Sequence, residues 1–591
     1  MNILSFFAFK HPNIIFIIIF SSALNNLLIS QNQPISPLMY SYQEHTALKS
    51  TSPYGLEWVH LGPTLNGARV EAIQSDPNKP GTIYAAFGSG GLWKTINNGL
   101  DWNPIFENMP SLGIGDIAIA PSNTEIIYVA TGESLKKARN FTMPGTGVYR
   151  SNNGGDTWAH IGLNDTWHIG EIVVHPNNPD IVLVAAQGHF WSSNENRGIF
   201  RTDDGGKSWN HVLFIDENTG ANDIVFSRAN PKIVYATTWE NYPDVNGKKS
   251  AVYKSEDAGL VWNKIINGVT INKNTGRIGI AASYQDKDKA YIFIDQRNQR
   301  NGQGTGEVYK TINGGKNWKK THKENIKSLS VIGWYFMDMY VNPQNDEEIY
   351  GLGVRLIHSI DGGKTFKNIG GKITHLTPSP AQTLHLDHCE MWINPSNPKE
   401  LLLGNDGGVY HSYDGGKSWL HLNNIPAGEF YDIEIDNQEP YHIYGGTQDD
   451  ATVYGFAQEY NSEFDDPWEY LWIDAWSGGD GCITLVDPND ENTVYFSMQN
   501  GGALRRNINT GKSVDIRPKF QKEDNIKVQY NFITPYMLSH FDSNTVYMAG
   551  NYVMRSKDRG DNWTVISPDL IKERDHTKTE TAAGALAESY F

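Results

Sequence analysis

The stretch Thr95-Ile96-Asn97-Asn98-Gly99-Leu100-Asp101-Trp102 decides the fold, because its pattern returns seven more times along the chain. The pattern is Ser/Thr-x-Asp/Asn-x-Gly-x-x-Trp/Phe, and its copies begin at Thr95, Ser151, Thr202, Ser255, Thr311, Ser359, Ser412 and Ser556. The first seven copies begin 48 to 56 residues apart, and such a period is typical of a repeat protein. A weaker copy begins at Asn507, about two periods after Ser412. The sequence therefore predicts about ten repeat units.

Each repeat unit contains four short runs of strand-forming residues. In the first unit these runs are 70–75, 82–87, 92–95 and 102–106, separated by turns rich in Gly, Pro and Asn. Short strands at regular intervals, with no helical period between them, indicate an all-β protein. Four strands per unit are typical of a β-propeller blade, so we predict a propeller of about ten four-stranded units.

The repeated turn has a mechanical explanation. An Asp or Asn side chain can accept hydrogen bonds from the backbone of its own turn, and Gly adopts a left-handed conformation without steric cost. The Trp or Phe that follows can pack between neighbouring units. We therefore expect each copy of the turn to be structural rather than catalytic.

The composition excludes some classes of function. The 591 residues include 66 acidic and 49 basic side chains, giving a net charge of −17. Nucleic-acid binding depends on Lys and Arg neutralising phosphates, so we expect no nucleic-acid partner. The two cysteines, Cys389 and Cys482, fall in the seventh and ninth units. One unit lies between them, so we expect their Cα atoms to be farther apart than the ~7 Å limit for a disulfide and predict two free thiols.

The two ends of the chain differ from the repeats. Residues 1–30 contain Lys10 before an apolar run, Ile14 to Phe20, which predicts a signal peptide and a periplasmic, cell-surface or secreted protein. The run is short for a membrane span, so no stable span is expected, although a single anchor helix is the alternative. Residues 31–55 read as a flexible lead-in, and Trp58 to Leu61 as a lone fourth strand. Residues 571–591 read as a linker and the start of a truncated unit.

Several short segments resemble a known family. They are Gly91-Leu92-Trp93-Lys94-Thr95, Val129-Ala130-Thr131-Gly132-Glu133, His385-Leu386-Asp387-His388, Gly404-Asn405-Asp406-Gly407-Gly408 and Ile566-Ser567-Pro568-Asp569-Leu570. Together with the repeated turn, which is the Asp-box or BNR motif, they resemble the bacterial sortilin-like or BNR-repeat "glycosyl hydrolases". The likeness extends from about Trp58 to Leu570.

The resemblance implies two alternative arrangements of the units. Sortilins close ten blades into one ring, whereas xyloglucan-cleaving hydrolases place two seven-bladed propellers face to face. The turn motif fails after Leu422. We therefore favour a seven-bladed propeller over 56–425 plus part of a second, sortilin-like set of blades over 426–570, with a single ten-bladed ring as the alternative.

Carboxylates predicted on one rim of the propeller are the candidate catalytic groups. Loops before the first strand and between the second and third strands of each unit share a face. Glycoside hydrolysis uses two carboxyl groups about 5–9 Å apart. Asp449 or Asp450 with Asp480 is the favoured pair because their units are neighbours, and Asp387 is the second choice. The first unit's loop, Gly88 to Gly91, lacks the carboxylate that xyloglucan-cleaving propellers carry there.

The same rim supplies candidate binding residues. Aromatic faces beside polar groups suit sugar rings, although propeller rims are commonly polar. The predicted binding residues are Glu133, His189, Trp191, Trp239, Glu240, Trp334, Tyr335, Asp387, His388 and Gln448. His385, Asp387 and His388 could begin a metal site, but they lack a recognised metal motif, so no metal and no other cofactor is expected.

Two functions remain open from the sequence. The first is an exported propeller that acts on or binds a polysaccharide or oligosaccharide, with glycoside hydrolysis by rim carboxylates. The second is a non-catalytic, sortilin-like propeller that binds a protein, peptide or glycan. The sequence leaves open whether the protein is an enzyme.

Overall fold

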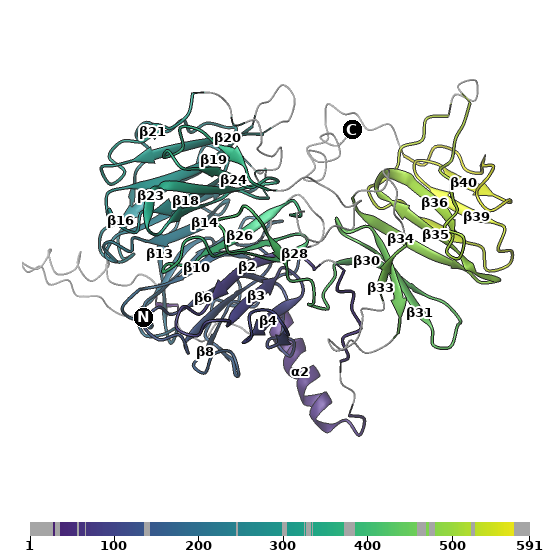
Figure 1. The fold of residues 1–591 in the computed structure, drawn as a ribbon, viewed down its shortest axis with the longest axis horizontal. Helices are drawn as coiled ribbons and strands as arrows, with labels where there is room; N and C mark the ends of the chain where they lie inside the picture. The colour runs from purple at the N-terminus through teal and green to yellow at the C-terminus, as the bar shows by residue number, and fades with distance from the viewer. Residues whose placement is uncertain are drawn as a thin grey trace, which may run out of the picture.

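The computed structural model describes residues 28–29, 36–55, 58–65, 67–134, 142–243, 246–297, 304–323, 326, 333, 335–370, 384–457, 468–471, 479–521 and 526–571. Within these ranges the protein consists of ten antiparallel sheets, one α-helix and one short 3-10 helix (Figure 1). The all-β propeller predicted from the repeats is confirmed.

The first seven sheets are named in chain order. They are sheet 1, β2 (Val70–Ser75), β3 (Ile83–Phe87), β4 (Gly91–Thr95) and β5 (Asn103–Pro104); sheet 2, β6 (Ile114–Ile119), β7 (Ile127–Thr131), β8 (Val148–Ser151) and β9 (Ala159–His160); sheet 3, β10 (Ile169–Val174), β11 (Val182–Ala186), β12 (Gly198–Thr202) and β13 (Trp209–Leu213); sheet 4, β14 (Thr219–Phe226), β15 (Val234–Glu240), β16 (Ala251–Ser255) and β17 (Asn263–Lys264); sheet 5, β18 (Thr275–Ala282), β19 (Ala290–Arg297), β20 (Gly304–Thr311) and β21 (Lys319–Lys320); sheet 6, β22 (Asp338–Asn342), β23 (Asn345–Leu352), β24 (Ile357–Ser359) and β25 (Lys367–Asn368); and sheet 7, β26 (His388–Ile393), β27 (Leu401–Asn405), β28 (Gly408–Ser412) and β29 (Leu420–His421).

The remaining elements complete the described chain. They are sheet 8, β30 (Phe430–Ile435), β31 (His442–Thr447), β32 (Thr452–Phe456) and β33 (Trp468–Tyr470); sheet 9, β34 (Gly481–Asp487), β35 (Asp490–Met498), β36 (Gly502–Asn507) and β37 (Ser513–Asp515); sheet 10, β38 (Tyr536–Leu538), β39 (Val546–Ala549), β40 (Val553–Ser556) and β41 (Thr564–Val565); the helices α2 (Pro37–Thr51) and η1 (Gln499–Gly501); and β1 (Leu28–Ile29), which pairs with β13 at the edge of sheet 3.

Contacts between first strands join sheets 1 to 7 in a closed cycle. Each first strand packs on the next, from β2 on β6 through to β22 on β26, and β26 and β27 then pack on β2. The backbone N–H of Gly67 donates to the carbonyl of Gly407 at 3.1 Å across this last contact. Sheets 8, 9 and 10 form a second group, in which β30 packs on β34 and β34 on β38 (Figure 1).

Apolar side chains fill the space between neighbouring sheets. Between sheets 7 and 1, Ile73 and Trp93 pack with Leu402 and Val409, and all four are buried. Burying each such side chain contributes about 1.5–3 kcal/mol, so these interfaces dominate the stability of the fold. Sheet 8 differs from sheet 1 at the equivalent position. Ile433 follows the bulge in β30 as Ile73 follows the bulge in β2, but Ile73 is buried whereas Ile433 is 63% exposed.

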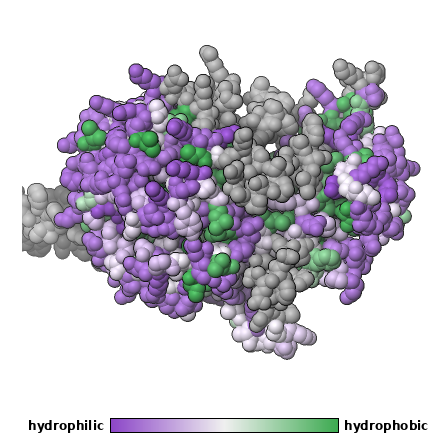
Figure 2. Space-filling view, in the orientation of Figure 1, coloured by the Kyte–Doolittle hydropathy of each residue, from purple (hydrophilic) through white to green (hydrophobic). Residues whose placement is uncertain are grey.

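On the face that Figure 2 shows, the described surface is mostly hydrophilic, and hydrophobic residues are scattered over it. No helix among the described residues is long and apolar enough to cross a bilayer. The signal peptide predicted for residues 1–30 falls almost entirely outside the described residues, as does the linker and truncated unit predicted for 571–591 apart from Ile571.

The repeated turn joins the third and fourth strands of its sheet by the predicted hydrogen bonds. In the first copy, Thr95 Oγ1 donates to Asn97 Oδ1 at 2.8 Å, and the N–H groups of Gly99 and Asp101 donate to these two oxygens at 3.0 and 3.1 Å. The hydroxyl-to-Asp/Asn bond recurs in all eight copies. The Trp158 indole donates to the carbonyl of Ile105 in the preceding unit, so the turn also links neighbouring sheets.

Two segments before the first sheet differ from expectation. Residues 37–51, expected as a lead-in, form α2, because Ser36 caps its first turn and Pro37 suits that position. The prediction of a strand at Trp58 to Leu61 is wrong, since these residues are not in a strand. Instead, the Leu61 carbonyl accepts a hydrogen bond from the Trp468 indole in sheet 8 at 2.6 Å.

Both cysteines are free, as predicted, and both are buried. Cys389 lies in β26 of sheet 7 and Cys482 in β34 of sheet 9, so sheet 8 comes between them in the chain.

Replacing Gly170 by alanine tests the close approach of the first strands. A Cβ atom at Gly170 would lie 2.4 Å from the Asn222 carbonyl oxygen, which belongs to the backbone of the next sheet and cannot rotate away. Gly170→Ala is expected to lower the free energy of unfolding by about 1–3 kcal/mol in chemical denaturation. Gly55→Ala is the control, because nothing lies within 4 Å of its added carbon. Equal stability of the two variants would contradict the packing described here.

Candidate functional site

A buried arginine lies where sheets 1, 2, 7 and 8 approach one another. Arg69 directly precedes β2, and its Nε and Nη2 donate to the two carboxylate oxygens of Asp406 at 2.8 Å each. Its Nη1 donates to Glu133 Oε1 at 3.2 Å and to Glu429 Oε2 at 3.4 Å. The guanidinium carbon lies 4.8 Å from the centre of the Tyr335 ring. One side chain therefore joins residues from four separate parts of the chain.

Short connections between strands bring these partners to Arg69. Asp406 lies in the tight turn between β27 and β28, Glu133 follows β7, and Glu429 directly precedes β30. All three positions are on loops at one end of the sheets, opposite the repeated turn between third and fourth strands. Glu429 also accepts a hydrogen bond from Ser89 Oγ at 3.2 Å. A carboxylate from sheet 8 thus reaches the loop of sheet 1 that has none of its own.

The charges around Arg69 are unbalanced. Burial alone would lower the pKa of Arg69, but Asp406 and Glu429 raise it well above its usual value, so it stays cationic. Burial raises the pKa of Glu133 to about 8, against the opposing effect of Arg69. One fixed positive charge faces several carboxyl groups, and Glu133 therefore holds a proton at neutral pH.

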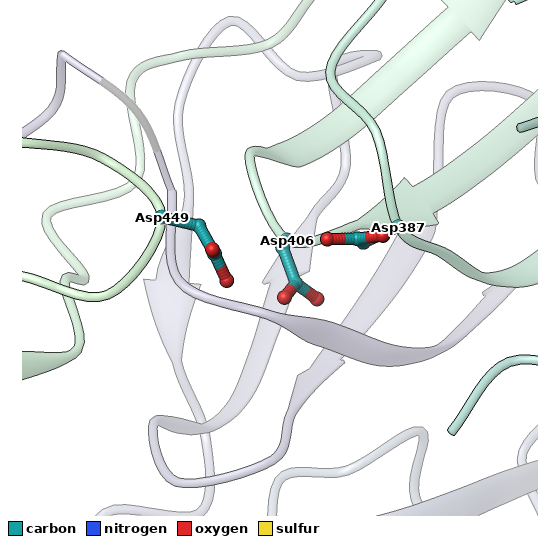
Figure 3. A group of neighbouring side chains, drawn as sticks. All are labelled: Asp387, Asp406 and Asp449. Carbon is teal, nitrogen blue, oxygen red and sulfur yellow. The ribbon is translucent and has the colours of Figure 1, made fainter. Parts of the chain in front are cut away.

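Three carboxylates converge beside this arginine. Asp387, Asp406 and Asp449 each place a carboxylate oxygen within 4.8 Å of the others, with Asp406 between its two neighbours in Figure 3. Asp406 is buried, whereas Asp387 and Asp449 are partly exposed and face the loops of sheets 7 and 8. The backbone N–H of Asp406 donates to the Asp387 carbonyl at 3.2 Å, which fixes the spacing of this pair.

The backbone is unusual at the two exposed members of the cluster. Asp387 and Asp449 have φ values of +64° and +57°, a left-handed conformation that costs a non-glycine residue about 1–3 kcal/mol. Strain of this kind persists where the surrounding structure fixes the side chain. It is commonly found at functional sites, and here it occurs at both residues that solvent can reach.

The favoured sequence pair also lies together. The backbone N–H of Asp449 donates to Asp480 Oδ1 at 3.2 Å, and Tyr431 donates its hydroxyl hydrogen to the same oxygen at 3.0 Å. Asp450 faces the other way, with its Oδ1 3.4 Å from His385 Nε2. Burial raises the pKa of Asp450 to about 6, although His385 opposes the shift. Burial would lower the pKa of His385, but Asp450 raises it to about 10, so the two form an ion pair at neutral pH.

Among the described residues, the three side chains that could have begun a metal site, His385, Asp387 and His388, are not grouped together. His385 faces Asp450, and only Asp387 of the three belongs to the carboxylate cluster. His388 is fully buried, and burial lowers its pKa to about 3. Asp387, Asp406 and Asp449 have oxygen ligands suited to a hard cation, but Arg69 already occupies both oxygens of Asp406.

The other predicted binding residues divide into two groups. Gln448 lies beside Asp449, donating to its Oδ2 at 3.2 Å, while Glu133 and Tyr335 contact Arg69. His189 stacks on Trp167 at 3.9 Å between ring centres, and Trp191 on the same loop is 40% exposed. Trp239 is fully buried, whereas Glu240 is partly exposed and accepts a hydrogen bond from the Lys249 backbone. Trp334 lies outside the described residues.

Sequence reasoning missed Glu429 and the central role of Arg69. Both immediately precede a first strand, where the loops of the predicted rim begin. That position was the available signal. Arg69 and Glu429 are 360 residues apart in the chain, so the sequence does not show that they meet; their contact depends on how the cycle of sheets closes.

Comparison with known proteins gives a consistent relationship. A family model described as Sortilin-Vps10, sortilin and neurotensin receptor 3, matches residues 146–350. The chain is similar to sortilin-type propellers. It is also 20% identical over 434 residues to a xyloglucanase from Paenibacillus sp, covering 68% of this chain and 36% of the relative. Xyloglucanase Xgh74A from Acetivibrio thermocellus is 23% identical over 375 residues, covering 51% and 41%.

The chain spans about two fifths of the length of these curated relatives. Among solved structures, the GH74 xyloglucanase from Xanthomonas campestris aligns with a TM-score of 0.49 and 15% identity, covering 88% of this chain and 82% of that one. The GH74 enzyme from Niastella koreensis aligns with a TM-score of 0.48 and 16% identity, covering 87% and 80%. The resemblance to sortilin-like and glycosyl hydrolase propellers that the motifs indicated is confirmed.

Replacing Arg69 by methionine tests its role in the site. Methionine has a similar length but leaves Asp406, Glu133 and Glu429 without their shared cation. Removing one partner of a buried ion pair costs about 3–5 kcal/mol, so Arg69→Met is expected to lower the free energy of unfolding by that amount. The measurement is chemical denaturation at neutral pH. Lys323→Met, at an exposed lysine, should be close to neutral, and an equally small effect at Arg69 would refute this assignment.

Proposed function

We propose that the protein is an exported glycoside hydrolase acting on a polysaccharide or oligosaccharide. The observation that carries the proposal is the convergence of Asp387, Asp406 and Asp449, with Asp450 and Asp480 adjacent, on the rim where sheets 7 and 8 approach. The similarity to xyloglucanases supports a carbohydrate substrate. The proposed domains are residues 56–425 and 426–570, and each contributes residues to this site. The repeated turns are proposed to be Asp-boxes.

The exposure of each carboxylate suggests its part in hydrolysis. Such reactions need one carboxyl group to protonate the leaving oxygen and another to act as base or nucleophile. Asp449 and Asp387 are the partly exposed members, so they are the groups that a sugar can reach. Asp480 accepts a hydrogen bond from the Asp449 backbone, and Asp450 pairs with His385. We propose that Asp480 and Asp450 complete the catalytic set by positioning the groups that contact the sugar.

Crowding of the carboxyl groups supports acid catalysis. The two hydrogen bonds from Arg69 keep Asp406 ionised against the opposing effect of burial, so a buried negative charge lies beside Asp387 and Asp449. A cluster of three neighbouring acids therefore retains a proton more readily than an isolated acid. That property suits a general acid working near neutral pH.

An aromatic platform on the same rim would bind the sugar chain. Trp167 stacks on His189, which lies 3.2 Å from Asp165, and exposed Trp191 follows on the same loop. Aromatic faces beside polar groups match the alternating apolar and hydroxyl faces of sugar rings. The matching sortilin family model also favours a second candidate, a non-catalytic propeller that binds a glycan, peptide or protein.

Single substitutions of the proposed carboxylates test the enzyme. Asp449→Asn and Asp387→Asn are expected to lower the release of reducing ends by at least about 100-fold, because each removes a proton-transfer group. Asp450→Asn and Asp480→Asn are expected to have smaller effects. The assay uses a panel of plant and microbial polysaccharides with the purified full chain.

The matched control is Asp156→Asn, whose carboxylate is 71% exposed on the opposite rim and should leave activity unchanged. If the wild-type protein releases no sugar from any polysaccharide but is retarded by one of them in affinity electrophoresis, the binding function replaces hydrolysis as the proposed function. Full activity in all four site variants would refute the assignment of these residues.

A further inference from the structure

The closed cycle of seven sheets surrounds a central cavity, which we call the tunnel. A cavity of about 430 Å³ is lined by residues of β2, β6, β10, β14, β18, β22 and β26, the first strands of all seven sheets. These inner strands therefore expose one side of their backbone to a shared internal space. The cavity is separate from the carboxylate cluster on the rim, because none of Asp387, Asp406 and Asp449 lines it.

Acidic residues occupy the same position in five of the seven inner strands. They directly precede a buried apolar residue that packs between sheets, such as Ile117 or Ile172. The five are Asp116, Glu171, Asp223, Asp338 and Glu390. The corresponding residues in the other two sheets are Ala72 and Gly279. The repeat thus places five carboxyl groups at one level of the cycle, and we call these five residues the acid ring. Four of them, Glu171, Asp223, Asp338 and Glu390, line the cavity.

The charges facing the acid ring are mostly of one sign. Arg277 on β18 donates to Asp338 at 2.9 Å, and Tyr340 on β22 lies against Glu390. Arg228 lines the cavity after β14, while Glu71 on β2 pairs with Arg69 at 3.9 Å near the rim. Among the described residues, Arg277 is the cation in direct contact with the acid ring, so one positive charge faces five acids.

Backbone donors satisfy part of the acid ring. Asp116 accepts from the N–H groups of Ile117 and Ile172 at 2.7 and 2.8 Å, and Asp223 accepts from Ile280 at 2.7 Å. The bonds from Ile172 and Ile280 cross between neighbouring sheets. The carboxyl groups of Asp116 and Asp223 therefore help to hold neighbouring sheets together.

We propose that the acid ring is a pH-sensitive device, which holds protons when the propeller is tightly closed and loosens the cycle of sheets when it ionises. Five like charges grouped around one cavity would repel one another strongly, because the surrounding protein screens them less than bulk water does. Uptake of protons removes this repulsion and leaves the hydrogen bonds between sheets in place.

The titration behaviour of the individual acids agrees with this device. Burial raises the pKa of Asp116 to about 8 and that of Asp223 to about 7, with neighbouring acids adding to the shift. Burial and the charges of Asp116 and Asp223 raise the pKa of Glu171 well above its usual range. The unfolded chain would have ordinary values near 4.

The direction of the effect on stability follows from these values. Between about pH 4 and pH 8 the folded state holds protons that the unfolded state has lost. Stability from this source is complete below about pH 4 and declines as the pH rises through 7 to 8. The protein is therefore expected to unfold at a lower temperature at pH 8 than at pH 5.

Glu171→Gln tests the proposal with the full-length chain. Glutamine has the shape of a protonated glutamic acid but cannot ionise. Its melting temperature is expected to match the wild type at pH 5 and to exceed it by about 2–4 °C at pH 8. Glu195→Gln, at an exposed acid following β11 in sheet 3, is the control and should follow the wild type at both values.

Other outcomes would overturn the proposal. Parallel pH profiles for wild type and Glu171→Gln would show that Glu171 does not titrate in this range. A gain in wild-type stability at pH 8 on adding calcium chloride, reversed by a chelator, would make the tunnel a cation site instead. If Glu171→Gln does not fold, Asp223→Asn provides the second variant, and the same gain at pH 8 is expected of it.

Discussion

Packing of the first sheet against the seventh is the contact on which the rest of the structure depends. Val70 and Ile73 of β2 meet Leu402 and Gly404 of β27, and Gly404 leaves space that Val70 fills, since a Cβ atom there would lie 2.5 Å from Val70 Cγ1. Without this contact sheets 1 to 7 would form an open stack with two exposed apolar faces. Closure also brings Arg69 to Asp406 and creates the tunnel.

Much of the fold follows from local sequence. The turn from Thr95 to Trp102 contains its own hydrogen-bond donors and acceptors, so its eight copies predict eight similar connections wherever the units lie. Strand lengths follow from the apolar runs between turns. No strand forms at Trp58 to Leu61; instead the His60 ring packs edge-on against Trp93, and the Leu61 carbonyl accepts a hydrogen bond from the Trp468 indole.

The site was less predictable for a physical reason. Asp449 and Asp480 belong to neighbouring units, so their proximity follows from the repeat, and the structure brings them together. Arg69 and Glu429 are 360 residues apart, and their contact depends on how the groups of sheets meet. The sequence also does not show which way a side chain points. Trp239 was predicted to lie on the rim, but it is fully buried.

Closure between distant sheets also has a consequence for synthesis in the cell. The apolar side of β2 emerges from the ribosome more than 300 residues before its partner in β27. At about 5–20 residues per second, roughly 15–65 s pass before the ring can shut. During that interval the nascent chain exposes the apolar face of sheet 1. Efficient folding should therefore depend on chaperones that cover this face until sheet 7 has been synthesised.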